Sequence, residues 1–253
     1  MWFQPQESCT NCHPAEQLGQ CERPEGPTRS IGVAKGDSAD SAGKYEMYTL
    51  YARAGWGSAL IETQLAWYGL PYRLEGIGDL FKEEAAGEKL RPVNPLMQLP
   101  TLVLPDGQIM TESAAITLYL AEATGRSDLV PPPPRPQFLR WLVFVIANIY
   151  PTHTYADVPG RFVAGEEAQR AFEANVNAYA RRLWEIMEAE ASAPWFLGAH
   201  FTALDLFIAV MTKWRPTRAW FKTHAPRLHA IALAAQVAPQ IGEVWSRNFP
   251  DNA

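Results

Sequence analysis

Residues 98–113 read Gln-Leu-Pro-Thr-Leu-Val-Leu-Pro-Asp-Gly-Gln-Ile-Met-Thr-Glu-Ser, the most informative segment of the chain for its architecture. Its two short apolar runs, separated by Asp106 and Gly107, predict a β-hairpin. Pro100 stands where the first strand of this hairpin begins. Proline is rare at such a position in an inner strand, because it has no N–H to donate to a neighbouring strand. A cis peptide bond between Leu99 and Pro100 would remove the conflict, because cis bonds occur almost only before proline. The alternative is a trans proline on an edge strand.

The residues before this stretch predict a β-α-β unit. Residues 48–51 and 71–74 are short apolar and aromatic runs that favour two strands, which we expect to pair in parallel. Between them, apolar side chains recur with helical spacing from 59 to 68. Ser58 precedes this helix and Gly69 ends it, as capping residues usually do.

The residues after the hairpin predict a second helix and then a change of structure. That helix runs from 114 to 123, directly after Glu112 and Ser113. Residues 131–134 are all proline and predict a stiff, extended linker, beyond which nearly everything reads as helix. Thr202-Ala-Leu-Asp205 predicts a capping box that opens a buried helix over 204–211. We therefore expect a disordered extension at 1–46, a thioredoxin-like domain at 47–126, a Pro-rich linker at 127–136 and an all-helical domain at 137–248.

Four stretches of the chain resemble the glutathione transferases. They are residues 48–69, the segment Asn94-Pro-Leu-Met-Gln-Leu-Pro-Thr-Leu102, residues 106–120 and residues 196–205. The second and third together, at this spacing, are specific to the family. The resemblance extends from about residue 48 to about residue 245. It implies the family's fold, an α/β thioredoxin-like N-terminal domain followed by an all-α C-terminal domain.

The resemblance also implies where glutathione binds. The cis bond at Pro100 would turn the amide and carbonyl of Leu99 outward, where they pair with the cysteinyl backbone like a β-strand. The γ-glutamyl carboxylate would dock at the amino end of the second helix, on Ser113, with Glu112 near the ammonium group. Gln98 matches a position that contacts the glycyl end. Plain helix capping by residues 112 and 113 is the structural alternative, and the two roles are compatible.

A transferase of this kind must ionise the thiol of glutathione, because the thiolate is the nucleophile. A free thiol titrates at about 8.5, so a hydrogen-bond donor aimed at the sulfur is expected. The candidate is Ser58, with helix capping as its alternative role. Loop length places Gly57 rather than Ser58 where some relatives carry a cysteine. Trp56 and Arg53 are further donors within reach, and so is Tyr51, which we expect instead in the core.

The second substrate would lie between the two domains, beside a kink expected at Pro151. The residues expected to line its pocket are Arg53, Trp56, Phe144, Asn148, Tyr150, Tyr155 and Trp214. His153 lies among them, but the sequence fixes no partner that would make it a general base. The aromatic excess favours an apolar or planar electrophile. Ordinary core and interface packing is the alternative for these residues, and a solvated loop charge is the alternative for Arg53.

Composition excludes several classes of protein. The chain has 253 residues and a net charge of −5, from 22 basic and 27 acidic side chains. No cationic excess is available for phosphates, so nucleic acid is not an expected partner. No apolar run has the length of a membrane helix, no secretory signal is expected, and cysteine is absent after Cys21. We therefore expect a cytoplasmic protein with no metal and no mixed-disulfide chemistry, and the resemblance implies a homodimer.

The first 46 residues contain Cys9-Thr-Asn-Cys12-His13, which matches the pattern for haem attachment. Such attachment normally follows export, and a five-residue pattern arises easily by chance. We favour an inert tail, with a weak metal site and haem as the alternatives. Met47 comes directly before the first predicted strand, and we interpret it as the native start.

Two functions follow as hypotheses. The first is an enzyme that conjugates the glutathione thiolate to a small, apolar or aromatic electrophile, or carries out a related peroxidase or lyase reaction. The second is a non-catalytic module on the same fold that binds glutathione or another protein, because function depends on the site rather than on the fold.

Overall fold

The computed structural model describes residues 47–132 and 135–250, and the structural statements below refer to these residues. The predictions for residues 1–46 lie outside them. The strands are β1 (Tyr48–Ala52), β2 (Tyr72–Gly76), β3 (Thr101–Val103) and β4 (Ile109–Met110). The α-helices are α1 (Ala59–Tyr68), α2 (Glu84–Leu90), α3 (Ser113–Thr124), α4 (Arg135–Phe144), α5 (Tyr150–Asp157), α6 (Glu166–Glu190), α7 (Ala203–Met211), α8 (Arg218–His224), α9 (Pro226–Gln236) and α10 (Gly242–Asn248). Shorter turns are the π-helix Val145–Ile149 and the 3-10 helices Pro159–Arg161 and Pro239–Ile241.

The strands form one mixed sheet in the order β2-β1-β3-β4. β1 pairs in parallel with β2, with Tyr48 opposite Tyr72, and antiparallel with β3, with Leu50 opposite Leu102. β3 and β4 form the hairpin. Parallel strands require a crossover connection, and α1 supplies it. The predicted order of β-α-β unit, hairpin and helix is confirmed.

Helix α2 was not predicted. It has seven residues and only two buried side chains, Ala86 and Leu90, so it offers too short an apolar period to recognise. These two side chains pack with Ile77 and Leu99 in a small cluster of their own. Through this cluster, α2 supports the chain just before Pro100.

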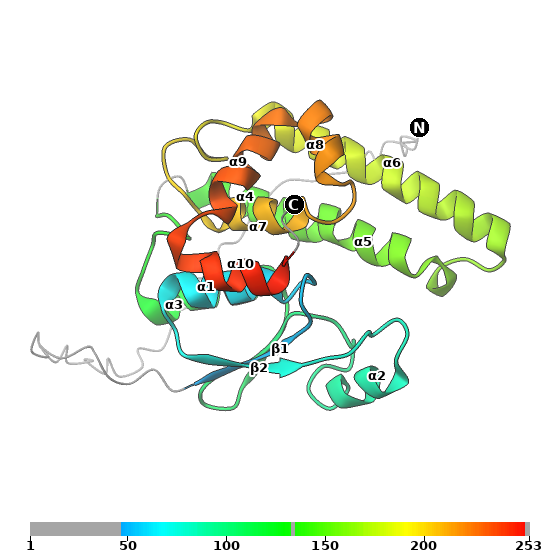
Figure 1. The fold of residues 1–253 in the computed structure, drawn as a ribbon, viewed down its shortest axis with the longest axis horizontal. Coiled ribbons are helices and arrows are strands. Elements are labelled where there is room, and N and C mark those ends of the chain that lie inside the picture. The colour runs from blue at the N-terminus through cyan, green and yellow to red at the C-terminus, as the bar shows by residue number, and fades with distance from the viewer. Residues whose placement is uncertain (1–46, 133–134, 251–253) are drawn as a thin grey trace, which may run out of the picture. The chain divides into compact units, whose positions relative to one another are not determined.

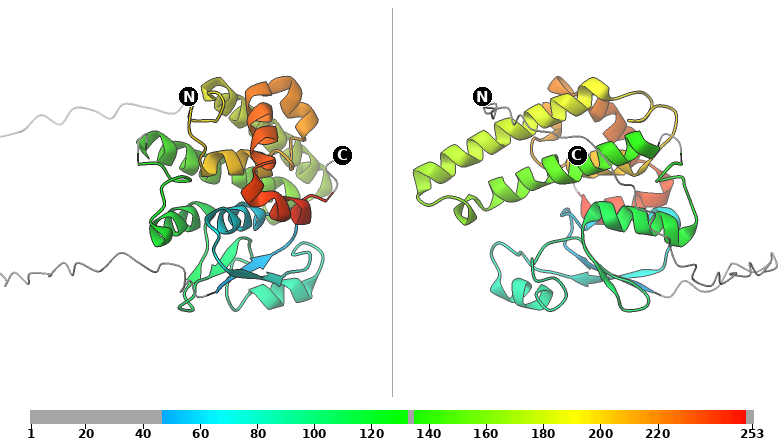
Figure 2. Two further views of the ribbon diagram at one scale, coloured as in Figure 1. Left: turned by 60° about the vertical axis from the view of Figure 1, so that its left-hand side comes forward. Right: turned by 180° about the vertical axis from the view of Figure 1, so that it is seen from behind.

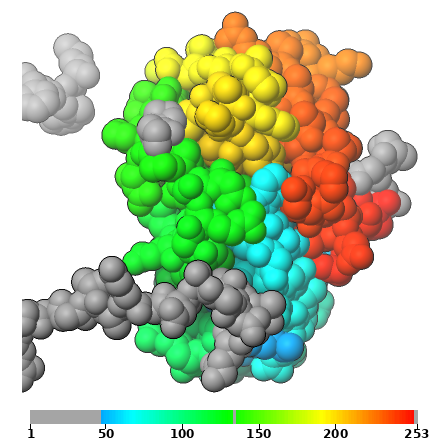
Figure 3. All heavy atoms as spheres, turned by 90° about the vertical axis from the view of Figure 1, so that its left-hand side faces the viewer, coloured from blue at the N-terminus to red at the C-terminus, as the bar shows by residue number. Residues whose placement is uncertain are grey.

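Helix α1 lies at the centre of the packing. Figure 1 shows it with α3 and α10 on one face of the sheet. Eight of its ten residues are buried, including Glu62, because it also contacts α7. One hydrophobic cluster contains both Leu50 of the sheet and Leu206 of α7. In Figure 3 the cyan atoms of this region directly touch the green and red-orange atoms around them. The thioredoxin-like part and the helical part therefore share one core.

The C-terminal part is all-helical, as predicted. Helices α5 and α6 contact each other and run side by side (Figure 2). Helix α7 is buried along its whole length, and its capping box is present. The carboxylate of Asp205 accepts hydrogen bonds from the amides of Thr202 at 2.7 Å and Phe196 at 2.8 Å. Among the described helices, none is both long and apolar enough to cross a bilayer.

Candidate active site

Two adjoining cavities lie between the sheet and the helices that follow it. The smaller has a volume of about 200 Å³, and its wall includes Gln98, Leu99, Pro100, Glu112 and Ser113. All five residues predicted to bind glutathione therefore line one cavity. The larger has a volume of about 540 Å³ and lies beside the loop between β1 and α1. The two cavities share four wall residues, namely Gln98, Leu99, Tyr150 and Thr154.

The turn before Pro100 is built around a buried asparagine. The peptide bond between Leu99 and Pro100 is cis, as predicted. The side-chain amide of Asn94 donates to the carbonyl of Gln98 at 2.9 Å and to the hydroxyl of Thr101 at 3.0 Å. The Asn-Pro segment quoted above thus holds the ends of the turn together and presents Leu99 to both cavities.

The amino end of α3 borders the smaller cavity. Glu112, just before the helix, has φ 64° and ψ 103°, a left-handed backbone conformation that is rare for a residue with a side chain. Its side chain makes no capping hydrogen bond to the first turn. Backbone strain of this kind concentrates at binding sites. Ser113 is 4% exposed and still lines the cavity, so the uncapped turn is directed at a small opening.

Tyr150 reaches both cavities because of an irregular turn before it. Pro151 has no N–H and its ring crowds the carbonyl four residues earlier, which disrupts an α-helix. The chain responds with the π-helix at Val145–Ile149, in which the amide of Tyr150 bonds the carbonyl of Val145. Such turns recur at functional sites. The phenol of Tyr150 donates to the carbonyl of Leu99 at 2.9 Å.

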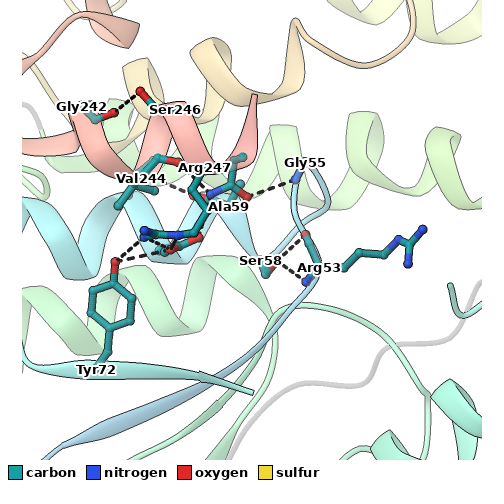
Figure 4. Close-up of polar contacts among 12 residues, drawn as sticks. Arg53, Gly55, Ser58, Ala59, Tyr72, Gly242, Val244, Ser246 and Arg247 are labelled. Carbon is teal, nitrogen blue, oxygen red and sulfur yellow. Dashed lines mark hydrogen bonds and ion pairs between the residues drawn. The ribbon is translucent and has the colours of Figure 1, made fainter. Parts of the chain in front are cut away.

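Ser58 does not face either cavity, which speaks against the catalytic role predicted for it. Its side chain is fully buried, its hydroxyl donates to the carbonyl of Arg53 at 3.0 Å, and it accepts from the Arg53 amide at 3.1 Å (Figure 4). The single hydroxyl proton is thus committed to the protein's own backbone. Ser58 does occupy the capping position directly before α1, as predicted, and its carbonyl accepts the Ile61 and Glu62 amides, but its side chain makes no bond to the helix.

Three other residues predicted for the substrate pocket line neither cavity. Arg53 pairs with Asp79 at 3.2 Å and covers the Trp56 ring at 5.1 Å. Phe144 packs edge-on against Trp141, 5.0 Å between ring centres. The amide of Asn148 bonds back to the carbonyl of Phe144 within its own helix at 3.2 Å. The side chains of Phe144 and Asn148 thus serve packing or the local helix, which was their alternative interpretation, whereas Arg53 is held in an ion pair.

The remaining predicted residues do form walls. Tyr155 borders the smaller cavity, and Trp56 and Trp214 border the larger one. The Trp56 ring lies 4.9 Å from Phe81, which also borders the larger cavity. The indole of Trp214 donates to the carbonyl of Gly55 at 2.7 Å, so the helical part holds the loop after β1.

His153 stands beside this wall in an apolar setting. Its ring lies 5.0 Å from Trp214 and 6.5 Å from Tyr150, both edge-on. Burial, and then the nearby Arg215 guanidinium, lowers the pKa of His153 to about 4. Its Nε2 has no hydrogen-bond partner within residues 47–132 and 135–250. The imidazole is therefore neutral near pH 7 and is a weak base.

A buried carboxylate that sequence reasoning missed holds the loop from the other side. Glu62 on α1 is 1% exposed and accepts hydrogen bonds from Arg247 and, at 2.7 Å, from the side chain of Asn248. The side-chain oxygen of Asn248 in turn accepts from the amide of Gly55 at 3.1 Å. A glutamate inside a helix and an Arg-Asn pair 185 residues later carry no local pattern that links them.

Comparison with known proteins agrees with this geometry. The family model described as "Glutathione S-transferase, N-terminal domain" matches residues 62–123. The uncharacterized GST-like protein YncG of Escherichia coli K12 is 36% identical over 206 residues, which is 80% of this chain and 98% of that protein.

Solved structures show the same fold. A glutathione transferase homologue from Sulfitobacter, with bound glutathione, superposes with a TM-score of 0.69 at 20% identity, over 79% of this chain and 97% of that one. A glutathione transferase from Burkholderia graminis, with two glutathione molecules per subunit, has a TM-score of 0.62 at 20% identity, over 82% and 90%. On the near-complete match to YncG, the chain belongs to the glutathione S-transferase family.

Proposed function

We propose that this protein binds glutathione in the smaller cavity and transfers it to an electrophile held in the larger one. The observation that carries the proposal is the convergence of Leu99, beside the cis Pro100, with Ser113 at the start of α3 on a single cavity. These groups come from separate elements, and each suits a different part of the tripeptide. The overlap of the two cavities at Leu99 and Tyr150 supports a reacting sulfur at that junction.

The physical chemistry of the smaller cavity fits glutathione along its length. An extended cysteinyl backbone would pair with the main chain of Leu99. The γ-glutamyl carboxylate would accept hydrogen bonds from the amide and hydroxyl of Ser113, where the helix dipole favours negative charge. Glu112 would balance the ammonium group, and Gln98 would meet the glycyl end. These roles account for an α3 start that its own side chains leave uncapped.

The larger cavity favours a substrate with an apolar, planar part. Trp56, Phe81 and Trp214 supply aromatic surface, on which planar rings stack well. The same wall has four basic side chains against the two acids Asp79 and Asp157; the basic residues are Lys82, Arg161, Lys213 and Arg215. We therefore propose an aromatic electrophile that carries an anionic or strongly electron-withdrawing group.

A non-catalytic module remains the second candidate, and one observation favours it. Gly57, in the loop two residues before α1, has no side chain to offer, and the hydroxyl of Ser58 is committed to Arg53. A protein without a sulfur-directed donor would bind glutathione without lowering its thiol pKa. Transfer to an electrophile would then be no faster than in solution at the same pH.

Titration calorimetry with glutathione, followed by an assay with chlorodinitrobenzene, tests the proposal. We expect saturable binding and enzyme-dependent formation of the conjugate. Binding with no acceleration of any aryl or alkyl electrophile would identify the binding module instead. Absence of binding would refute both candidates.

Ser113→Ala tests the carboxylate site directly. Loss of a hydrogen bond to a charged group costs about 1.5–3 kcal/mol, so glutathione affinity should fall roughly 10- to 100-fold. Ser127→Ala, in an exposed loop outside both cavities, is the matched control and should bind normally. Equal affinity of the two variants would remove the proposed carboxylate contact.

The family also supports two wider proposals. We propose that the protein acts in the cytoplasm and as a homodimer. Analytical ultracentrifugation of the purified protein measures its mass in solution, and a monomer at micromolar concentration would contradict the second of these.

A further inference from the structure

Gly57, in the loop just before α1, has no side chain, and another residue occupies the space that a side chain there would fill. A Cβ atom built on Gly57 would lie 1.9 Å from the phenol oxygen of Tyr150 and 2.6 Å from the carbonyl oxygen of Leu99. The hydroxyl of Tyr150 thus stands in the volume that a side chain at position 57 would fill. It arrives there from the helical part of the chain, across the junction of the two cavities.

We propose that Tyr150 is the catalytic residue that hydrogen-bonds the glutathione thiolate, in place of a side chain at position 57. This inference rests on the proposed function. The phenol now donates to the Leu99 carbonyl, the acceptor that the cysteinyl N–H of glutathione would use. When that N–H takes over the carbonyl, the phenol proton can rotate to the sulfur beside it.

The electrostatics of the site suit a donor rather than a base. Burial, followed by the charges of Glu112 and Asp157, raises the pKa of the Tyr150 phenol above its usual range. The phenol therefore stays protonated and cannot accept the thiol proton. That proton leaves to bulk water, and the O–H···S bond stabilises the negative charge left on sulfur. The sulfur lone pair then forms the new bond to carbon, and the leaving group departs with its electron pair.

Ultraviolet absorbance of the bound thiolate against pH measures the property at issue. In the wild-type complex we expect the thiol pKa to lie below the free value of about 8.5. Tyr150→Phe should raise this pKa by at least about one unit, with a fall of about tenfold or more in kcat/KM for chlorodinitrobenzene near pH 6.5. Tyr68→Phe removes a hydroxyl from another buried tyrosine that borders neither cavity, and it should match the wild type in both measurements.

The outcomes separate this inference from the proposed function. If Tyr150→Phe binds glutathione with an unchanged thiol pKa, the inference is overturned while the binding site stands. If Tyr150→Phe loses affinity for glutathione but keeps the wild-type thiol pKa, the role of Tyr150 is to position Leu99, and the inference is likewise overturned. If the wild type binds no glutathione, the proposed function itself fails.

A second substitution covers the case in which Tyr150→Phe does not fold. Site-specific replacement of Tyr150 by fluorotyrosine keeps the shape and the hydroxyl and makes the phenol a stronger donor. The thiol pKa should then fall further below that of the wild type. No change in the thiol pKa, in a complex with normal affinity, would overturn the inference.

Discussion

At the scale of single residues, the hydroxyl of Tyr150 fills the space that a side chain at Gly57 would occupy. A residue with a side chain would clash at position 57, because the nearest atoms to an added Cβ are the phenol of Tyr150 and a main-chain carbonyl. Side chains can rotate away from such a contact, but the carbonyl of Leu99 belongs to a turn held by Asn94. The absence of a side chain is thus a steric condition of the site.

Gly57→Ala should therefore disturb both stability and binding. Overpacking of this kind typically costs about 1–3 kcal/mol, and displacement of Tyr150 should also weaken glutathione binding. Gly76→Ala is a suitable control, because a Cβ there meets nothing within 4 Å. Urea unfolding and calorimetry on both variants make the comparison. A Gly57→Ala protein as stable as the control would show that the site has more room than the geometry allows.

His153 predicts a dependence of stability on pH. Its folded-state pKa of about 4 lies below the ordinary value of 6.5, so between these values the unfolded chain binds a proton that the folded chain does not. The buried neutral imidazole therefore makes its full contribution to the unfolding free energy above pH 6.5. This contribution is lost as pH falls towards 4, and the loss at pH 5 is on the order of 2 kcal/mol. His153→Gln should flatten the difference in unfolding free energy between pH 7 and pH 5, whereas substitution of the exposed His200 should not.

At the scale of elements, local patterns predicted those parts of the fold that depend on near neighbours. The strands at residues 48 and 72, the hairpin and α3 each carry a complete signal within about a dozen residues. The cis bond followed from one proline at a strand start. Helix α2 was not predicted, because its two buried residues pack in a cluster formed mainly by other segments and give no helical pattern of their own.

In the candidate site, too, only the features that depend on local sequence could be predicted. Residues 98–100 and 112–113 were found because their motifs are local, and they line one cavity as expected. The partner of the Ser58 hydroxyl could not be predicted, because its bond to the main chain of Arg53 depends on the shape of the loop. Tyr150 was placed in the pocket, but its bond to Leu99 spans 51 residues and no spacing rule predicts it.

The capping box of α7 yields a prediction at this scale. Asp205→Ala would leave buried amides of Thr202 and Phe196 without an acceptor, and should lower the unfolding free energy by about 2–4 kcal/mol. Asp106→Ala removes a similar carboxylate-to-amide bond in the exposed hairpin turn and should cost about 1 kcal/mol or less. Chemical denaturation distinguishes them. Equal losses would mean that the box contributes no more than a surface turn.

At the scale of the whole molecule, the loop after β1 is held by residues distant in sequence. Trp214 bonds the carbonyl of Gly55 and Asn248 bonds its amide. Asn248 is itself anchored on the buried Glu62, beside Arg247. The geometry at the front of α1 therefore depends on helix α10, which contributes no wall to either cavity.

Asn248→Ala should reveal this dependence. It leaves the Gly55 amide and one Glu62 oxygen without their partner, so we expect a loss of about 2–3 kcal/mol in stability together with weaker glutathione binding. Ser246→Ala lies on the same helix and loses only an exposed bond to Gly242, so it should behave as wild type (Figure 4). If binding is unchanged in Asn248→Ala, the loop does not need α10.

The bond between Gly55 and Asn248 also has a meaning for biosynthesis. The two residues are 193 positions apart. Ribosomes add about 5–20 amino acids per second, so roughly 10–40 seconds separate their appearance. During that interval the nascent chain holds an unfinished loop whose amide has yet to meet its acceptor. A newly translated molecule therefore completes the loop beside the larger cavity late, after α10 has left the exit tunnel.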